Sequence, residues 1–137
     1  MRSRNKASRS ARAALVGMAL LIASCVGDIF VPSMALPGGF RLEQFESTHY
    51  YVQRGDWLVP GGVLGGEIGQ IGWNEHHIVA WRSAMRGRET SGWMIIDVGR
   101  GSIEGPLSVA AFRDRMARDG ALRDITVRSV KEAWSSR

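Results

Sequence analysis

From residue 40 onward, apolar residues recur along much of the chain at the two-residue spacing of β-strands. The segments expected to form strands are 40–45, 48–53, 57–59, 66–73, 76–82 and 93–98. Asn74 and Glu75 separate two of these segments, which predicts an antiparallel hairpin with a two-residue turn. The segment 93–98 is apolar at nearly every position, as is typical of a central strand buried on both faces.

A different period follows and predicts one helix. Val109, Phe112 and Met116 are spaced for one helix face, and Ser108 precedes them as an N-cap whose hydroxyl can accept a free backbone N–H. Gly120 is expected to end the helix, because glycine tolerates the backbone conformation found there. We therefore predict Phe112 and Met116 to face the sheet.

The resulting fold class is α+β: a small antiparallel sheet of about five or six strands with one clear helix near the C-terminus. A last apolar segment, 122–130, follows this helix. The expected organisation is a cleaved signal peptide over 1–24, a tether over 25–39 and a single globular domain over 40–137. Six glycines between residues 60 and 72 lack the lysine of a phosphate-binding loop and predict a tight turn running into a strand with bulges or close backbone approach.

The N-terminal 24 residues carry the pattern of an export signal. Five basic residues without an acid lie in 1–12, and 13–24 are free of charge. Twelve apolar residues suit a signal-peptide core, whereas a membrane span needs about 20. The segment ends in Ile22-Ala23-Ser24-Cys25, which resembles the lipobox of bacterial lipoproteins.

This resemblance implies signal-peptidase recognition of Ile22, Ala23 and Ser24, and a lipid on Cys25, the only cysteine. Cys25 in an uncleaved helix and ordinary cleavage after Ala35 are the two alternatives. The lipoprotein pattern, with Val26 after the cysteine, implies an outer-membrane protein facing the periplasm; the outer face of the cytoplasmic membrane is the alternative.

Charge argues against nucleic-acid binding. The formal net charge of +5 comes from the five basic residues of the leader, because the remaining 13 basic residues match 13 acidic ones. A nucleic-acid-binding domain needs its positive charge on the folded part. The expected partners are the membrane, through the lipid anchor that the lipobox resemblance implies on Cys25, and a protein.

Candidate catalytic and metal chemistry is sparse. Adjacent residues of a strand point to opposite faces, so His76 and His77 cannot both join one metal site. His49 is the remaining histidine, and Cys25 is assigned to the anchor. No serine lies in a nucleophile-elbow motif. We expect no metal, no cofactor and no enzymatic activity.

Tryptophan is the residue type that favours binding. Five tryptophans follow the leader, and indoles contribute both to cores and to the energetic centres of protein interfaces. We expect two or three of them in the core. The candidates for a protein-binding face are Trp57, Trp81 and Trp134.

The stretch from about residue 50 to 120 resembles an uncharacterised family of small bacterial lipoproteins. The shared motifs are Ile71-Gly72-Trp73-Asn74, Trp93-Met94-Ile95-Ile96-Asp97, Gly105-Pro106-Leu107-Ser108 and Phe112. The glycine-rich segment 60–72 departs from the family pattern. This resemblance implies location and fold rather than an activity.

The C-terminal part is similar to the GYF-like peptide-binding domain. That similarity consists of Trp93, the Gly105-Pro106-Leu107-Ser108 helix entry, a helix ending at Gly120, and then Asp124, Val127 and Trp134. Met94 stands where the GYF-like pattern has tyrosines, which weakens the aromatic surface that a proline-rich ligand needs. The leading hypothesis is a non-enzymatic envelope lipoprotein that binds a protein, as an immunity or inhibitor protein against an envelope-acting toxin. An assembly component of an envelope complex is the alternative, followed by a cell-wall-active enzyme.

Overall fold

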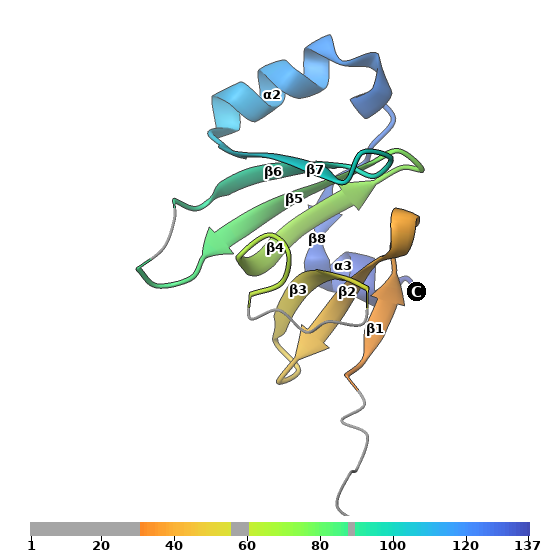
Figure 1. Cartoon of the computed structure of the whole chain (residues 1–137), viewed down its shortest axis with the longest axis vertical. Helices are drawn as coiled ribbons and strands as arrows, with labels where there is room; N and C mark the ends of the chain where they lie inside the picture. The colour runs from red at the N-terminus through yellow and green to blue at the C-terminus, as the bar shows by residue number, and fades with distance from the viewer. Residues whose placement is uncertain (1–30, 56–60, 88–89) are drawn as a thin grey trace, which may run out of the picture. The chain divides into compact units, whose positions relative to one another are not determined.

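The computed structural model describes residues 31–55, 61–87 and 90–137 (Figure 1). The predicted α+β class is confirmed: these residues form two antiparallel sheets, with one long helix near the C-terminus. The strands are β1 (Ser33–Ala35), β2 (Phe40–Phe45), β3 (His49–Arg54), β4 (Gly66–Trp73), β5 (His77–Ala84), β6 (Gly92–Asp97), β7 (Ser102–Leu107) and β8 (Arg128–Ser129). The helices are α2 (Val109–Arg118) and α3 (Val130–Ser135), with 3-10 turns η1 (Pro37–Gly39) and η2 (Gly120–Leu122).

The first sheet has the order β1-β2-β3. Its first strand lies inside the segment that the sequence predicted to be a tether, so the folded part begins earlier than residue 40. Met34 pairs with Leu42 of β2, and the carbonyl of Pro32 accepts a hydrogen bond of 3.0 Å from the backbone N–H of Gln44. A strand of three residues has too few positions to show a period, which explains the later predicted start.

The second sheet has the order β7-β6-β5-β4-β8, so β6 lies in its interior as predicted. The predicted hairpin is formed by β4 and β5, although its turn spans residues 74–76. The side-chain oxygen of Asn74 accepts hydrogen bonds from the backbone N–H groups of His76 and His77, at 2.9 and 2.8 Å. This bonding lengthens the turn by one residue and ends β4.

The glycine-rich segment runs into β4 as predicted, with a bulge and a close backbone approach. The register between β4 and β5 shifts between Ile68 and Gln70. A Cβ atom on Gly72 would lie 2.6 Å from the carbonyl oxygen of Thr126 and 2.8 Å from Cγ2 of Ile125. Glycine is therefore required for residues 125–126 to cross β4 at this distance.

The two faces of the five-stranded sheet take part in different apolar clusters. Ile71 and Ile78 belong to a cluster with Leu42 and Val52 of the three-stranded sheet. The opposite face, which we call the outer face, carries a second cluster that includes Phe112 of α2. Figure 1 shows α2 on the outer face, next to β6 and β7.

Helix α2 begins as predicted: the Ser108 hydroxyl accepts the backbone N–H of Ala111 at 3.1 Å. Phe112 is 6% exposed, and Leu107, just before the cap, packs in the same cluster, an arrangement known as a hydrophobic staple. Met116 is partly buried against this cluster. The helix ends at Arg118, and Gly120 opens the following 3-10 turn.

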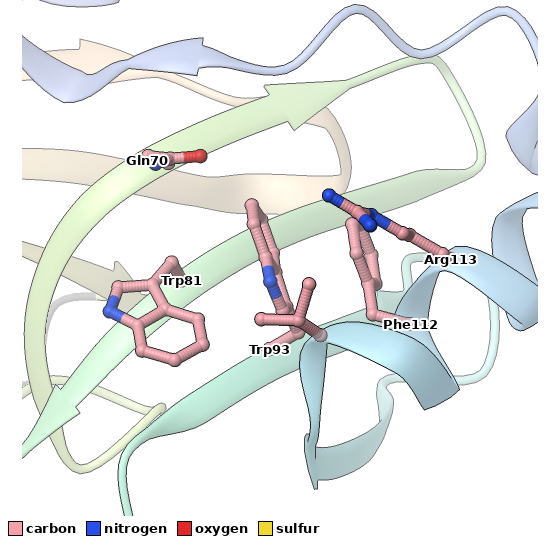
Figure 2. A pocket seen from close by; sticks show the side chains of 6 residues that line it. Gln70, Trp81, Trp93, Phe112 and Arg113 are labelled. Atoms are coloured by element: carbon pink, nitrogen blue, oxygen red, sulfur yellow. The ribbon is translucent and has the colours of Figure 1, made fainter.

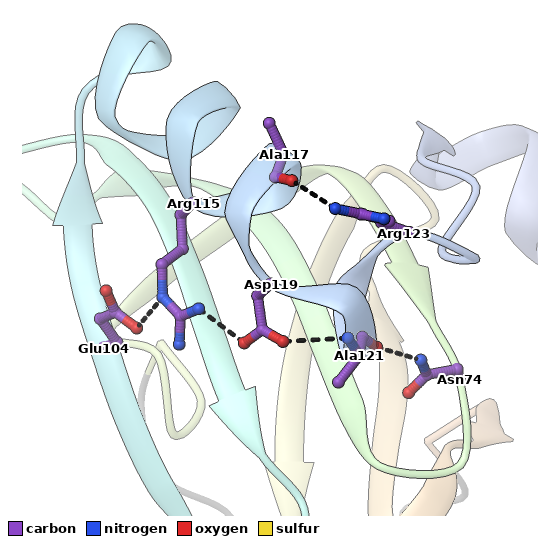
Figure 3. Close-up of polar contacts among 7 residues, drawn as sticks. All are labelled: Asn74, Glu104, Arg115, Ala117, Asp119, Ala121 and Arg123. Atoms are coloured by element: carbon purple, nitrogen blue, oxygen red, sulfur yellow. Dashed lines mark hydrogen bonds and ion pairs between the residues drawn. The ribbon is translucent and has the colours of Figure 1, made fainter.

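The C-terminal end of α2 is tied to two parts of the sheet (Figure 3). Arg115 donates to Glu104 of β7 at 3.2 Å and to Asp119 at 2.6 Å. Asp119 accepts the backbone N–H of Ala121, whose carbonyl in turn accepts the amide of Asn74 at 2.8 Å. The helix is thus held at its C-terminal end by polar contacts and on its sheet-facing side by Phe112 and Met116.

The final apolar segment forms β8, which pairs with β4, and the short helix α3. Ser129 and Glu132 form a reciprocal capping box at the start of α3. Among the described residues, no helix has the length and apolar character needed to cross a membrane.

Candidate functional site

Aromatic residues align across the outer face of the five-stranded sheet. In the pairing register, Gln70 of β4 lies opposite Trp81 of β5, Trp81 lies opposite Trp93 of β6, and Trp93 lies opposite Leu107 of β7. Directly opposed residues of antiparallel strands place their side chains on one face, within contact distance. The register therefore builds one continuous row from four strands.

Helix α2 covers only part of this row. The ring of Phe112 stacks on the indole of Trp93, with centroids 4.1 Å apart and planes inclined by 5°. Trp81 meets Trp93 edge to face at 5.8 Å, on the side away from Phe112 in the view of Figure 2. As a result Trp93 is 7% exposed, whereas Trp81 is only partly buried.

The uncovered part of the row is hollowed (Figure 2). A cavity of about 400 Å³ opens there, a volume within the range of small-ligand sites. Val109, in the first turn of α2, borders it and is 47% exposed. We call this cavity the aromatic groove; it is lined by Gln70, Trp81, Trp93, Val109, Phe112 and Arg113.

The electrostatics of the aromatic groove favour negative charge. None of the six lining residues is acidic, and Arg113 carries the one formal charge among them. The first turn of α2 also lacks an acidic residue, so the partial positive charge of this helix end is not offset locally. Arg113 is exposed, as expected from its place on the solvated face of the helix.

A second cavity, of about 180 Å³, lies on the outer face and borders α2 at Arg115. We call it the polar hollow; it is lined by His77, Ile95, Asp97, Arg100, Ser102, Glu104 and Arg115. Within it His77 lies opposite Asp97, and Asp97 lies opposite Ser102.

This row contains the residue types of a hydrolytic triad in the wrong order. A triad needs histidine between the acid and the nucleophile. Here Asp97 stands between Ser102 and His77, which lie two strands apart, or about 9.6 Å at the usual strand spacing. Nδ1 of His77 is buried and has no hydrogen-bond partner among the described residues.

Hydrogen bonds lower the pKa of two carboxyls in or next to the polar hollow, those of Asp97 and Asp119. The backbone N–H of Arg100 donates to Asp97 at 2.9 Å and keeps the pKa of that carboxyl below its ordinary value, with further help from the charges of Arg100 and His77. The Arg115 guanidinium lowers the pKa of Asp119 in the same way. Each acid thus already has a donor, which is typical of structural rather than catalytic carboxylates.

Of the three tryptophans expected on a binding face, the structure places one at a cavity. Trp81 lines the aromatic groove. Trp134 is instead a core residue, 8% exposed, with its ring 5.4 Å from that of Tyr50. Its residue type made it a candidate for a binding face, but as part of α3 it packs into the core. Trp57 lies outside the described residues, as do the lipobox residues Ile22, Ala23, Ser24 and Cys25.

The remaining residues of the aromatic groove were not predicted as a site. The sequence predicted that Phe112 lies in the core and Arg113 on a solvated face, and both predictions are confirmed. Both residues also border the cavity. The sequence could have indicated this site through the pairing of Trp81 with Trp93. That pairing follows once segments 76–82 and 93–98 are aligned in the correct register. In the described part of the chain, no three histidine, cysteine or acidic residues are grouped to hold a metal ion.

Comparison with protein-family models, with curated proteins and with solved structures found no match. The resemblances to small lipoproteins and to the GYF-like domain therefore stay predictions.

Proposed function

We propose that this chain is a lipid-anchored protein of the bacterial envelope that binds a partner protein through the aromatic groove and catalyses no reaction. The observation that carries the proposal is the half-covered aromatic row. Val109 is 47% exposed at the edge of a cavity, and Trp81, which packs on the outer-face cluster, is only partly buried there. Indole rings at the edge of a cavity are typical energetic centres of protein interfaces.

The chemistry of the lining residues supports binding over catalysis. Nucleophilic or acid–base catalysis needs a hydroxyl, thiol, imidazole, amine or carboxyl group within reach of the substrate. The aromatic groove offers an amide from Gln70 and a guanidinium from Arg113, which are hydrogen-bonding groups rather than nucleophiles or general bases. These two groups can orient a ligand without transforming it.

The lipobox-like run supports the envelope location. A lipid on Cys25 would hold the folded part, which begins near Ser33, close to the membrane surface. A small anchored binder of this kind fits the role of an immunity or inhibitor protein that meets a toxin at the envelope. The same groove would serve an assembly component, so the identity of the captured protein separates the two roles.

The anchor is tested with Cys25→Ala in the full chain. We expect the variant to accumulate as unlipidated precursor, to lose labelling by palmitate and to leave the membrane fraction after an alkaline wash. A variant that still incorporates palmitate would contradict the lipobox assignment.

The partner site is tested by photo-crosslinking in cells. A photoreactive residue at Val109 should give a discrete protein adduct, whereas the same residue at Phe45 should not. These positions are a matched pair, because both side chains are 47% exposed but Phe45 lies at the end of β2, outside the aromatic groove. Trp81→Ala, combined with the photoreactive residue at 109, should remove the adduct.

Equal adducts from positions 109 and 45, or an adduct that Trp81→Ala leaves unchanged, would overturn the groove as the binding site. If the adduct is a toxin, cells that express the parent chain should survive it and cells with Val109→Asp should not. An adduct with a subunit of an envelope complex would instead establish the assembly role.

A further inference from the structure

We infer that the aromatic groove binds a polypeptide segment that carries a carboxylate next to an apolar side chain. This inference rests on the proposed function and adds the chemistry of the partner. It follows from two halves of the site, one apolar and one cationic, that meet at the first turns of α2.

The apolar half comes from the three rings. Trp93 and Phe112 form a stacked pair, and Trp81 lies edge-on to Trp93, so aromatic rings border the cavity from two strands and from α2. Val109 adds an exposed aliphatic group on the helix side. A volume of about 400 Å³ suits one apolar side chain and its adjoining backbone better than a large folded surface.

The cationic half is Arg113, which differs from the other two arginines of α2. Arg115 is paired with Glu104 and Asp119, and Arg118 is paired with Asp114. Arg113 forms no hydrogen bond or ion pair within residues 31–55, 61–87 and 90–137, although it borders the cavity. A guanidinium presents a planar set of donors that matches a carboxylate in two parallel hydrogen bonds.

Two further features make a carboxylate the complementary group. The N-terminal end of α2 carries no acid in its first turn, so its field favours an anion. Gln70, across the cavity on β4, adds an uncharged amide that can accept a backbone N–H or donate to a carbonyl. If an apolar side chain of the ligand packs on the rings, Arg113 can thus bind the neighbouring carboxylate of the ligand and Gln70 its backbone.

A glycan fits the site less well. A sugar can lie flat on an indole, but its several hydroxyl groups each need a partner when they leave water. Besides the indole N–H groups of Trp81 and Trp93, Gln70 and Arg113 carry the only polar side-chain groups among the six residues that line the aromatic groove. Most hydroxyls of a bound sugar would therefore be left without a partner.

The carboxylate can come from two sources: the C-terminus of the partner, or an aspartate or glutamate next to an apolar residue. Small probes separate them. N-acetyl-leucine carries a terminal carboxylate, N-acetyl-leucinamide carries none, and N-acetyl-glutamyl-leucinamide carries it on a side chain. N-acetylglucosamine represents the glycan.

Binding is measured on the full chain in detergent micelles, from the NMR shift of the Trp81 indole N–H, which the Trp81→Phe variant identifies. Probes of this size are expected to bind in the millimolar range. We expect at least one carboxylate probe to bind about tenfold more tightly than N-acetyl-leucinamide. Arg113→Gln should bring that probe to the level of the amide without changing the affinity of the amide itself.

The matched control is Arg118→Gln, on the same helix but outside the aromatic groove, which should keep the tenfold preference. Equal binding of the acid and amide probes, unaffected by Arg113→Gln, would overturn the inference while leaving a groove that binds apolar groups, as the proposed function requires. Absence of binding by every leucine probe up to about 50 mM would also overturn it, and the adduct at position 109 would then decide the proposed function separately. Preferential binding of N-acetylglucosamine would overturn both.

Discussion

The phenyl ring of Phe112 lies on the indole of Trp93, with 4.1 Å between centroids and nearly parallel planes. One residue belongs to the helix and the other to the sheet interior, so this pair fixes where α2 stands on the outer face. The same pair forms one side of the aromatic groove. Stability of the fold and shape of the candidate site therefore depend on one contact.

Phe112→Ala should lower the free energy of unfolding by about 3–5 kcal/mol, because it removes a buried ring and leaves a cavity. Most domains have about 5–15 kcal/mol in total, so this loss approaches unfolding. Val109→Ala, at an exposed position of the same helix, should stay within about 0.5 kcal/mol of the parent. Urea denaturation of both variants measures the difference, and similar midpoints would contradict the core role of Phe112.

Ser108→Ala should cost about 1 kcal/mol, since the backbone N–H of Ala111 loses its acceptor at the start of α2. Ser108→Asn retains a side-chain acceptor and should recover most of this loss. Thermal denaturation followed by circular dichroism compares the three proteins. If the alanine and asparagine variants melt together below the parent, the loss arises from something other than the cap.

Gly72→Ala should destabilise the fold by about 1–3 kcal/mol, because the new Cβ overlaps the backbone oxygen of Thr126 and must displace it. Gly120→Ala is the matched control: its Cβ would meet nothing within 4 Å. This control should remain within about 0.5 kcal/mol of the parent. Equal effects at the two glycines would mean that residues 125–126 do not cross β4 as described.

Acid should destabilise the domain through carboxyls whose pKa is lowered in the folded state. The Arg115 guanidinium lowers the pKa of Asp119, and the Ser129 hydroxyl lowers that of Glu132. A carboxyl with a lowered folded-state pKa stabilises above its unfolded value, about 4, and this stabilisation is lost as the pH falls through the folded value. Melting temperature should therefore decline below about pH 4.

Asp119→Asn should melt below the parent at neutral pH and decline less on acidification, because one of the contributing groups is gone. Melting curves between neutral pH and about pH 2 test this, and an undiminished decline would assign the acid sensitivity to other groups.

Local patterns were sufficient for the hairpin and for α2, because each is specified by neighbours in the chain. Residues 66–82 contain both strands and their turn, and Ser108 and Phe112 specify the helix start within five positions. The separation into two sheets was not predictable in this way. It depends on β3 and β4, which are consecutive along the chain, lying in different sheets, and on β8 pairing with β4, which joins residues more than fifty positions apart.

The candidate site was predictable only in part for a similar reason. Trp81 was expected on a binding face because of its residue type, but its exposure follows from where α2 stops covering the row. Trp134 had the same residue type, but it lies on the buried face of α3 and its ring contacts that of Tyr50. Arg113 differs from Arg115 and Arg118 because those two arginines form ion pairs within the described residues. No sequence pattern shows which arginines of a helix will be paired.

Helix α2 borders both the aromatic groove and the polar hollow, so a ligand in one cavity can affect the other only if it displaces α2. Any ligand that binds one cavity more tightly when α2 moves also changes the affinity of the other cavity. The change must be reciprocal, with the same factor in both directions. Arg115 of α2 lines the polar hollow, whereas Val109, Phe112 and Arg113 of the same helix line the aromatic groove, so α2 is the structural element through which such an effect would have to pass.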